Sequence, residues 1–190
     1  MPNRRQFISS AAIAGLGLVT AAFVSALPFA RPALAGYEPP EGFHHQDWFQ
    51  TPTFDLRKDL MAANESGKML VLLWEQKGCE YCKAMHEIAF SYDEITDLAK
   101  ANFYVVQMDM RGKREFLDFN GNKKTEAAIA KASRVTFTPT TQFLETDGSE
   151  EYRMPGYAKP PVFLAVYQYV LEKGYRRLSF RDWVKEKVGG

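Results

Sequence analysis

The chain is poor in cysteine, with only two among its 190 residues. A framework of several disulfides, as in small secreted domains, is therefore excluded. A structural zinc site built from four cysteines is excluded for the same reason. The two cysteines, Cys79 and Cys82, have only two residues between them. Whatever chemistry they perform, they perform as a pair.

An excess of charge of either sign is also lacking. The formal net charge is +1, and no basic stripe stands out; Lys123–Lys124 and Arg176–Arg177 are only short basic pairs. Domains that bind nucleic acid carry a basic patch or stripe. The sequence therefore argues against a nucleic-acid partner. Beyond residue 35 there is no internal repeat or low-complexity tract, and the length of this part suits a single hydrophobic core.

The N-terminus has the pattern of an export signal. Residues 3–8 read NRRQFI, a twin-arginine pattern, and residues 7–27 carry no charge. Ala33–Ala35 then forms a small-x-small cleavage motif. A membrane anchor is the alternative, since the apolar span is nearly long enough to cross a bilayer. Its many small residues make it only moderately hydrophobic, so we favour cleavage after Ala35.

Three segments follow from this pattern. Residues 1–35 are expected to be a twin-arginine signal peptide, residues 36–53 a proline-containing extended lead-in, and residues 54–190 the folded domain. Twin-arginine signals are read by a bacterial export system. We therefore expect a mature protein in the periplasm, with no stable membrane insertion after the signal is removed.

The cysteine pair stands where a thiolate is stabilised. The continuous apolar run Met69–Trp74 precedes it, and a stretch with helical patterning follows it. A helix start supplies free backbone N–H groups and the positive end of a dipole, and both stabilise a thiolate. The spacing puts the second sulfur one turn on, within disulfide reach. The pattern favours a redox-active dithiol that needs no cofactor beyond the Cys79–Cys82 disulfide.

Two other uses of the pair are open. A disulfide across two intervening residues closes so short a loop that it contributes only about 2 kcal/mol to the stability of the fold. A purely structural role would therefore gain little. A metal site would need further ligands, and His86 lies on the same helical stripe, with His44 or His45 as an outside ligand. A copper or zinc chaperone using Cys79, Cys82 and His86 is therefore the second hypothesis. We prefer redox chemistry with no metal, which makes His86 a surface residue and leaves the other two histidines in a mobile lead-in.

The hydrophobic patterning predicts alternating strands and helices. Strands are expected over 68–74, 103–110, 140–145 and 151–154, and helices over 55–65, 79–90, 91–101, 125–133, 160–173 and from 179. Ser91–Glu94 matches a capping box for the second helical piece after the cysteines, and the last two strands flank a turn and form a hairpin. This order predicts an α/β fold with a mixed central sheet flanked by helices on both faces.

Five short segments carry more specific information: Gly78–Lys83, Phe103–Asp109, Asp118–Gly121, Val135–Thr140 and Pro155–Tyr157. Together they resemble the SoxW-like family of periplasmic thioredoxins, which is associated with bacterial sulfur-oxidation loci. The resemblance covers about residues 54–175. It implies a thioredoxin-like fold and a thiol–disulfide oxidoreductase that reduces protein disulfides of sulfur-oxidation or cytochrome-maturation partners, supplied by a membrane thiol electron donor.

Roles for the two cysteines follow from their chemistry. Cys79, at the helix start, is expected to be the attacking thiolate, and the more shielded Cys82 to resolve the mixed disulfide. Glu80 is expected to raise the pKa of the thiolate and Lys77 to lower it, so the two residues tune the redox couple in opposite directions. Tyr81 either packs over the motif and shapes substrate access or lies on the surface.

The resemblance also implies a role for Thr138 and Pro139. They correspond to the cis-proline loop that faces the disulfide and pairs with an extended substrate segment. The alternative is an ordinary proline at the start of a strand.

The sequence departs from the better-known thioredoxin pattern at two places. Gly78 replaces the usual tryptophan before the first cysteine, and Leu73 stands where a buried acid is expected. Glu75 is the nearest substitute, and since Trp74 and Glu75 alternate on a strand, one of them should face solvent or the motif. Residues 111–124 exceed a minimal connection. They form either a hairpin near the active-site end that selects partners or a packed loop.

Overall fold

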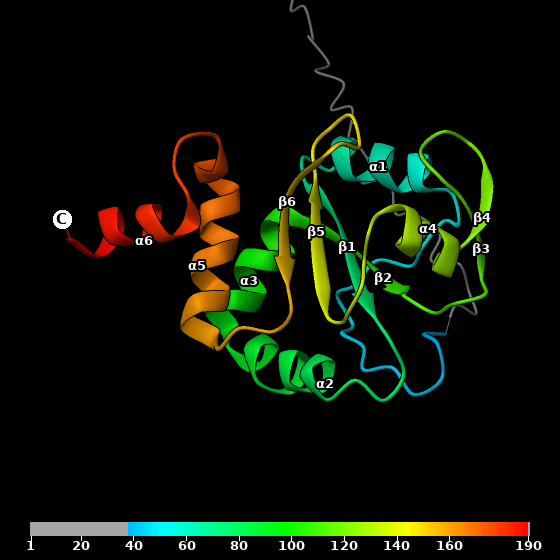
Figure 1. The fold of residues 1–190 in the computed structure, drawn as a ribbon, viewed down its shortest axis with the longest axis horizontal. Helices are drawn as coiled ribbons and strands as arrows, with labels where there is room; N and C mark the ends of the chain where they lie inside the picture. The colour runs from blue at the N-terminus through cyan, green and yellow to red at the C-terminus, as the bar shows by residue number, and fades with distance from the viewer. Residues whose placement is uncertain (1–37, 190) are drawn as a thin grey trace, which may run out of the picture. The chain divides into compact units, whose positions relative to one another are not determined.

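A four-stranded mixed sheet lies at the centre of the protein (Figure 1). The computed structural model describes residues 38–189, so the predicted signal peptide and its cleavage site lie outside the described residues. The strands, in spatial order, are β2 (Phe103–Asp109), β1 (Met69–Glu75), β5 (Thr140–Leu144) and β6 (Glu150–Pro155). β1 pairs in parallel with β2 and antiparallel with β5, which pairs antiparallel with β6. The predicted mixed sheet is confirmed.

Helices cover both faces of this sheet (Figure 1). One face carries α1 (Leu56–Glu65) and α4 (Glu126–Ala132), and the other carries α2 (Glu80–Glu87), α3 (Asp93–Asn102) and α5 (Pro160–Leu171). A 3-10 turn, Gly174–Arg176, leads from α5 to α6 (Phe180–Gly189). Over residues 38–189, none of the helices is long and apolar enough to cross a bilayer.

The protein has a hydrophobic core on each face of the sheet, and the continuous apolar run of β1 contributes side chains to both. Val71 and Leu73 face the core under α2, α3 and α5, while Leu70, Leu72 and Trp74 face the core under α1 and α4. A strand that is covered on both faces reads as an unbroken apolar run because neither face is solvated. The pattern therefore predicted a central strand correctly, and it fixes the position of the cysteines just beyond its carboxyl end.

The helix after the cysteines is shorter than predicted. α2 ends at Glu87, and a 3-10 turn, Ala89–Ser91, separates it from α3. The predicted capping box at Ser91 is wrong. The residue that caps α3 is Tyr92, without a side-chain hydrogen bond, because the Ser91 hydroxyl donates instead to the carbonyl of Ile88, at 2.8 Å.

The lead-in is packed against the domain, so the expectation of a mobile segment is wrong. Gln50 forms a parallel bridge with Val106 of β2, and its backbone N–H donates to the carbonyl of Val105 at 2.8 Å. The side chain of Phe49 is buried in the core under α2 and α3. These contacts bring the lead-in along the outer edge of β2 and place residues 43–48 beside α2.

Residues 111–124 form a hairpin, as one of the two expectations had it. Its strands are β3 (Glu115–Leu117) and β4 (Lys123–Thr125), paired antiparallel. The expected location near the cysteines is wrong. A Cβ at Gly148, in the β5–β6 turn, would lie 3.2 Å from the ring of Phe119, and this turn is at the end of the sheet opposite Cys79. The tip of the hairpin is therefore packed on the domain, away from the cysteines.

The turn of this hairpin is stabilised by one carboxylate. Asp118 accepts the backbone N–H groups of Asn120 and Asn122, each at 2.9 Å, and lies 2.7 Å from the Lys124 ammonium. The hydrogen bond from Lys124 is the main reason why the pKa of Asp118 falls to about 2; these backbone N–H groups also lower it, while burial opposes the shift.

We predict a pH-dependent contribution of Asp118 to stability. Its folded-state pKa is below the unfolded value, so the contribution is complete above about pH 4 and is lost as the pH falls toward about 2. Urea titrations across this range should show a smaller pH dependence of the free energy of unfolding for Asp118→Asn than for the unmodified protein. Equal slopes for the two proteins would contradict the assignment.

Candidate active site

The two cysteines form a disulfide at the start of α2. The Cα atoms of Cys79 and Cys82 are 5.2 Å apart, and the two sulfurs are bonded. Gly78 has a φ of +75°, a backbone conformation that residues with a side chain rarely adopt, and it turns the chain from β1 into α2. Cys79 is the N-cap residue of the helix, so its sulfur faces the free N–H groups of the first turn.

The two sulfurs have unequal environments. Cys82 is only 2% exposed, whereas Cys79 is partly exposed. The sulfur of Cys79 accepts the backbone N–H of Cys82 at 3.1 Å and the hydroxyl of Thr138 at 3.2 Å. Both donors, and the helix N-terminus, would stabilise a thiolate at Cys79 after reduction. Cys79 is therefore the sulfur that another molecule can reach and that is best stabilised as an anion.

A loop from the opposite half of the fold faces the disulfide. The Thr138–Pro139 peptide bond is cis, and the carbonyl of Pro139 accepts the backbone N–H of Gly156 at 2.7 Å. This bond holds the Pro-Gly-Tyr turn after β6 beside the loop. This placement brings Thr138 within hydrogen-bond distance of the Cys79 sulfur, although the two residues are 59 positions apart in the chain. Pro139 follows directly after Thr138.

Aromatic side chains lie in the segments that carry the disulfide and the cis-proline loop. Tyr81 is 68% exposed and Phe137 is 50% exposed. Tyr81 therefore lies on the surface instead of packing over the motif. Phe137 precedes the cis-proline loop and lies over Gly156, where an added Cβ would be 3.9 Å from its ring. Burial raises the pKa of the neighbouring Tyr157 phenol, and Tyr92 adds to this effect, so the Tyr157 hydroxyl is uncharged near neutral pH.

The two residues expected to tune the thiolate, Lys77 and Glu80, are both exposed. The Lys77 ammonium lies 3.5 Å from the carboxylate of Glu41 in the lead-in. Solvent and counter-ions screen charges at such positions. The backbone N–H of Cys82 and the Thr138 hydroxyl are closer to the Cys79 sulfur and carry more of its stabilisation.

Sequence reasoning missed a buried polar pair behind the cysteines. Glu75 is 1% exposed, and its carboxylate lies 2.8 Å from Nε2 of His86, which is 5% exposed. Trp74 is buried as well, so neither residue faces solvent. Glu75 instead faces α2, the helix that carries the cysteine motif, which was the other possibility expected for one of these two residues. Leu73, at the position of the expected acid, is part of the apolar core. The helical stripe Cys79–Cys82–His86 is the feature of the sequence that could have indicated this pair, because it faces the end of β1.

The interpretation of His86 as a surface residue is therefore wrong. Its Nε2 lies against Glu75, and its Nδ1 lies 3.2 Å from the amide nitrogen of Gln46. Both ring nitrogens are thus engaged away from the cysteine sulfurs. Among the described residues, no group of three potential ligands has the geometry of a metal site. The structure gives the metal-chaperone hypothesis no supporting contact.

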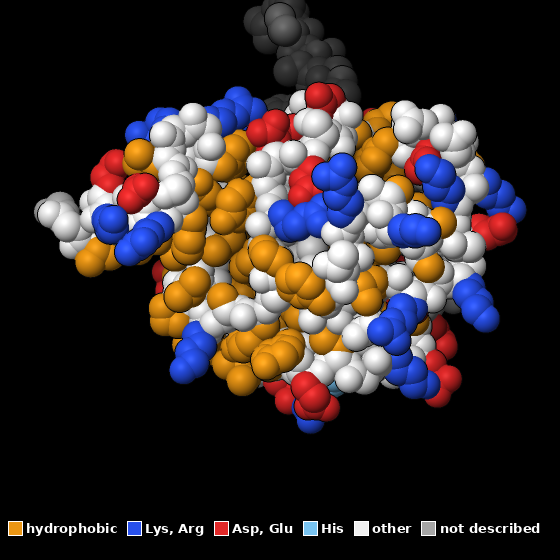
Figure 2. Space-filling view, viewed as in Figure 1, with side chains coloured by type: hydrophobic (Ala, Val, Ile, Leu, Met, Phe, Trp, Pro, Cys, Tyr) orange, Lys and Arg blue, Asp and Glu red, His pale blue; other side chains and the backbone are white. Residues whose placement is uncertain are grey.

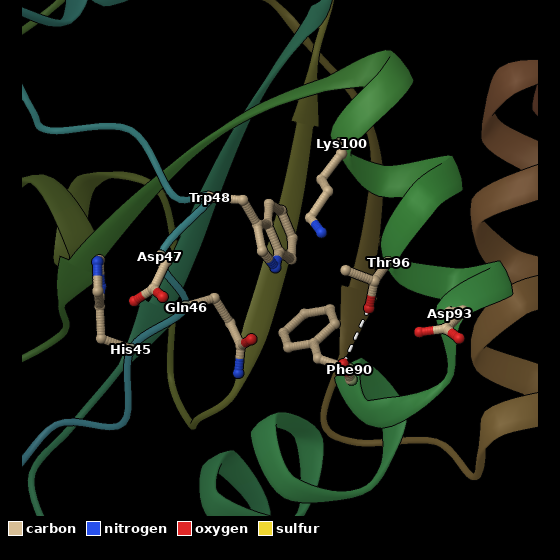
Figure 3. Close-up of a pocket in the computed structure, with 8 residues that line it drawn as sticks. All are labelled: His45, Gln46, Asp47, Trp48, Phe90, Asp93, Thr96 and Lys100. Carbon is tan, nitrogen blue, oxygen red and sulfur yellow. Dashed lines mark hydrogen bonds between the residues drawn. The ribbon is translucent and has the colours of Figure 1, made fainter.

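A pocket of about 570 Å³ lies between the lead-in and α3 (Figure 3). Gln46 and Trp48 approach it from the lead-in, and Phe90 and Thr96 from the helical side, where the Thr96 hydroxyl donates to the carbonyl of Phe90 at 2.9 Å. Its rim carries carboxylates and the Lys100 ammonium. The pocket is separate from the sulfurs, but it shares Gln46 with the buried pair.

Residues 56–171 match the family model described as a thioredoxin-like domain. The chain belongs to the thioredoxin-like domain family. The matched range begins at the first residue of α1 and ends at the last residue of α5. It contains both cysteines, the cis-proline loop and the Glu75–His86 pair of this thioredoxin-like domain. The lead-in contacts with that pair lie outside the range.

Solved structures with the same fold have low sequence identity to this thioredoxin-like chain. A thioredoxin-fold protein from Helicobacter pylori is 22% identical, with a TM-score of 0.57, over 70% of this chain and 94% of that one. A thioredoxin from Thermus thermophilus is 24% identical, with a TM-score of 0.50, over 62% and 84% of the two chains. At these identities the likeness establishes the fold alone. No curated protein sequence matches the chain significantly.

Proposed function

We propose that the protein is a thiol–disulfide oxidoreductase that reduces disulfides in other proteins. The observation that carries the proposal is the inequality of the two sulfurs at a helix start. Cys79 is accessible and has two hydrogen-bond donors, while Cys82 is buried beside it. A purely structural disulfide has no need of an accessible, anion-stabilising sulfur, whereas disulfide exchange needs one.

The reaction follows from this geometry. In the reduced protein, the Cys79 thiolate attacks one sulfur of a client disulfide, and the other client sulfur leaves as a thiolate. The Cys82 thiolate then attacks the Cys79 sulfur of the mixed disulfide, which releases the second client thiol. Two electrons pass to the client, which takes up two protons, and the protein is left with the Cys79–Cys82 disulfide seen in the structure. A dithiol donor must then reduce it for the next cycle.

A polypeptide client suits the surroundings of Cys79. Tyr81 in the first turn of α2 and Phe137 next to Thr138 expose apolar surface, and Figure 2 shows apolar side chains grouped over the face that carries β6 and α5. Exposed apolar patches of this kind mark interaction sites. Backbone groups of the Thr138–Pro139 loop, beside the sulfur, are available to pair with an extended client segment.

The cellular setting is part of the proposal. The twin-arginine pattern and cleavage motif support export to the periplasm, and the resemblance to SoxW-like thioredoxins supports clients in sulfur oxidation or cytochrome maturation. The periplasm is kept oxidising, so a reductant there requires a continuous electron supply. A membrane thiol relay is the class of donor that meets this need.

The reduction potential of the Cys79–Cys82 couple tests the function. We expect the mature protein to titrate against a thiol buffer as a reversible two-electron couple near about −270 mV, the value typical of thioredoxin. It should also reduce a protein disulfide catalytically when a dithiol donor is supplied. A potential near about −120 mV would make the protein an oxidant and reverse the proposed direction. Failure to titrate would overturn the proposed activity.

A further inference from the structure

A buried polar network connects the lead-in to the helix that carries the cysteines. Its centre is the carboxylate of Glu75, which lies 2.8 Å from His86 Nε2 and accepts the side-chain amide of Gln107 at 2.5 Å. Two lead-in side chains complete it. His45 Nδ1 lies 3.2 Å from the amide oxygen of Gln107, and the amide nitrogen of Gln46 lies 3.2 Å from His86 Nδ1.

Two backbone carbonyls fix the directions of these hydrogen bonds, because a carbonyl can only accept. The Gln107 amide nitrogen also contacts the carbonyl of His44 at 2.6 Å, so the same NH₂ group donates to Glu75. The Gln46 amide nitrogen also contacts the carbonyl of His86 at 3.5 Å, so this NH₂ group faces Nδ1 as a donor. His86 Nδ1 is therefore an acceptor and carries no proton.

The protonation of the pair follows from these directions. A neutral imidazole has one N–H, so the proton of His86 is on Nε2 and is donated to Glu75. Both carboxylate oxygens of Glu75 then accept hydrogen bonds, which leaves the group ionised with a neutral histidine beside it. Within residues 38–189, the ion-pair partner of Glu75 is His86, and no lysine or arginine pairs with it.

The uncompensated charge lies close to the resolving sulfur. His86 is four residues after Cys82, and both are buried, so their side chains are neighbours on one face of α2. The rings of Phe49 and Phe90 pack around His86, each with its centroid 5.5 Å away, and the ring of His44 lies 5.8 Å away. Burial among these rings lowers the local dielectric and lengthens the reach of the charge.

We propose that Gln46 is a positioning residue of the redox centre. By donating to Nδ1, it keeps His86 neutral with its proton toward Glu75, and so preserves a negative charge behind Cys82. This inference rests on the proposed function and deepens it. A nearby negative charge disfavours a cysteine thiolate, and a less stable reduced form makes a dithiol couple more reducing. A segment outside the family domain would thereby make the Cys79–Cys82 couple a stronger reductant.

Two matched glutamines of the lead-in test this role. Gln46→Ala admits water, which can donate or accept, so His86 is no longer held neutral. Gln50→Ala is the control, since the Gln50 side chain donates only to the carbonyl of Trp48 among the described contacts. We expect Gln46→Ala to shift the equilibrium constant with glutathione at least threefold toward the reduced protein, and Gln50→Ala to leave it unchanged. Glu75→Gln should shift it further, by at least tenfold, which corresponds to about 30 mV.

The imidazole nitrogens supply an independent readout. The chain has three histidines, so ¹⁵N spectra of histidine-labelled protein can be assigned by single substitutions. The expected state of His86 is a protonated Nε2 and an unprotonated Nδ1, and Gln46→Ala should change it. A proton on Nδ1 in the unmodified protein overturns the inference, as does a Gln46→Ala potential equal to that of Gln50→Ala. If no variant titrates reversibly, the proposed function fails, and the ¹⁵N spectrum alone decides the role of Gln46.

Discussion

Replacing Cys82 with serine is expected to trap protein clients on Cys79 as stable mixed disulfides and to reduce turnover to the uncatalysed rate. The partly exposed Cys79 would still attack, since it keeps the backbone N–H at residue 82 and the Thr138 hydroxyl as donors. Serine cannot resolve the intermediate, because its hydroxyl is not a sulfur nucleophile. Non-reducing gel electrophoresis of the reduced variant with an oxidised protein substrate would reveal the adduct.

The matched control for this trap is Cys79→Ser, which leaves the buried Cys82. With an exposed fraction of only 2%, Cys82 should form almost no adduct with a protein substrate. Turnover should be absent in both variants, while trapping separates them. Equal trapping through either cysteine would contradict the division of roles, and trapping through Cys82 alone would reverse it.

Replacing Phe143 with alanine is expected to cost about 3–5 kcal/mol of the free energy of unfolding. The side chain is fully buried in β5, and its ring centroid lies 5.3 Å from that of Phe103 and 5.4 Å from that of Tyr167. Removing it leaves a cavity between the sheet and α5, which rigid neighbours on both sides cannot fill. Urea denaturation monitored by circular dichroism would measure the loss.

Phe137→Ala provides the comparison within the same segment of the chain. Because half of the Phe137 surface is already exposed, the free energy of unfolding should change by no more than about 0.5 kcal/mol. A loss from Phe137→Ala as large as that from Phe143→Ala would show that the ring supports the fold and is not held out for a partner.

Most of the fold follows from local patterns in the sequence. The apolar runs at 68–74 and 103–110 correspond to β1 and β2 to within one residue at every end, because buried central strands require such runs. The turn Thr146–Ser149 predicted the β5–β6 hairpin. Element boundaries that depend on competing hydrogen bonds were less predictable, as at Ser91, whose hydroxyl closes the preceding turn instead of capping α3.

The cysteine pair and the residues of the loop opposite it could be identified from the sequence, but the polar network behind them could not. Its members come from the lead-in, β1, α2 and β2, and no spacing rule connects Gln46 or Gln107 with His86. His86 looked like a surface residue because a histidine on a helix with charged neighbours usually is one. Its burial arises from the lead-in, whose packing depends on tertiary contacts such as the Gln50–Val106 bridge.

That bridge has a consequence for how copies of the protein behave toward one another. The sheet has two outer strands, β2 and β6, and the unpaired backbone groups of an outer strand are a template for the strands of other chains. Gln50 occupies part of the β2 side, while the β6 side ends in Pro155, which has no N–H to offer. A chain shortened to the family domain, residues 56–171, would lose the Gln50–Val106 bridge. The lead-in therefore covers part of the edge at which the backbone of another chain could otherwise pair with β2.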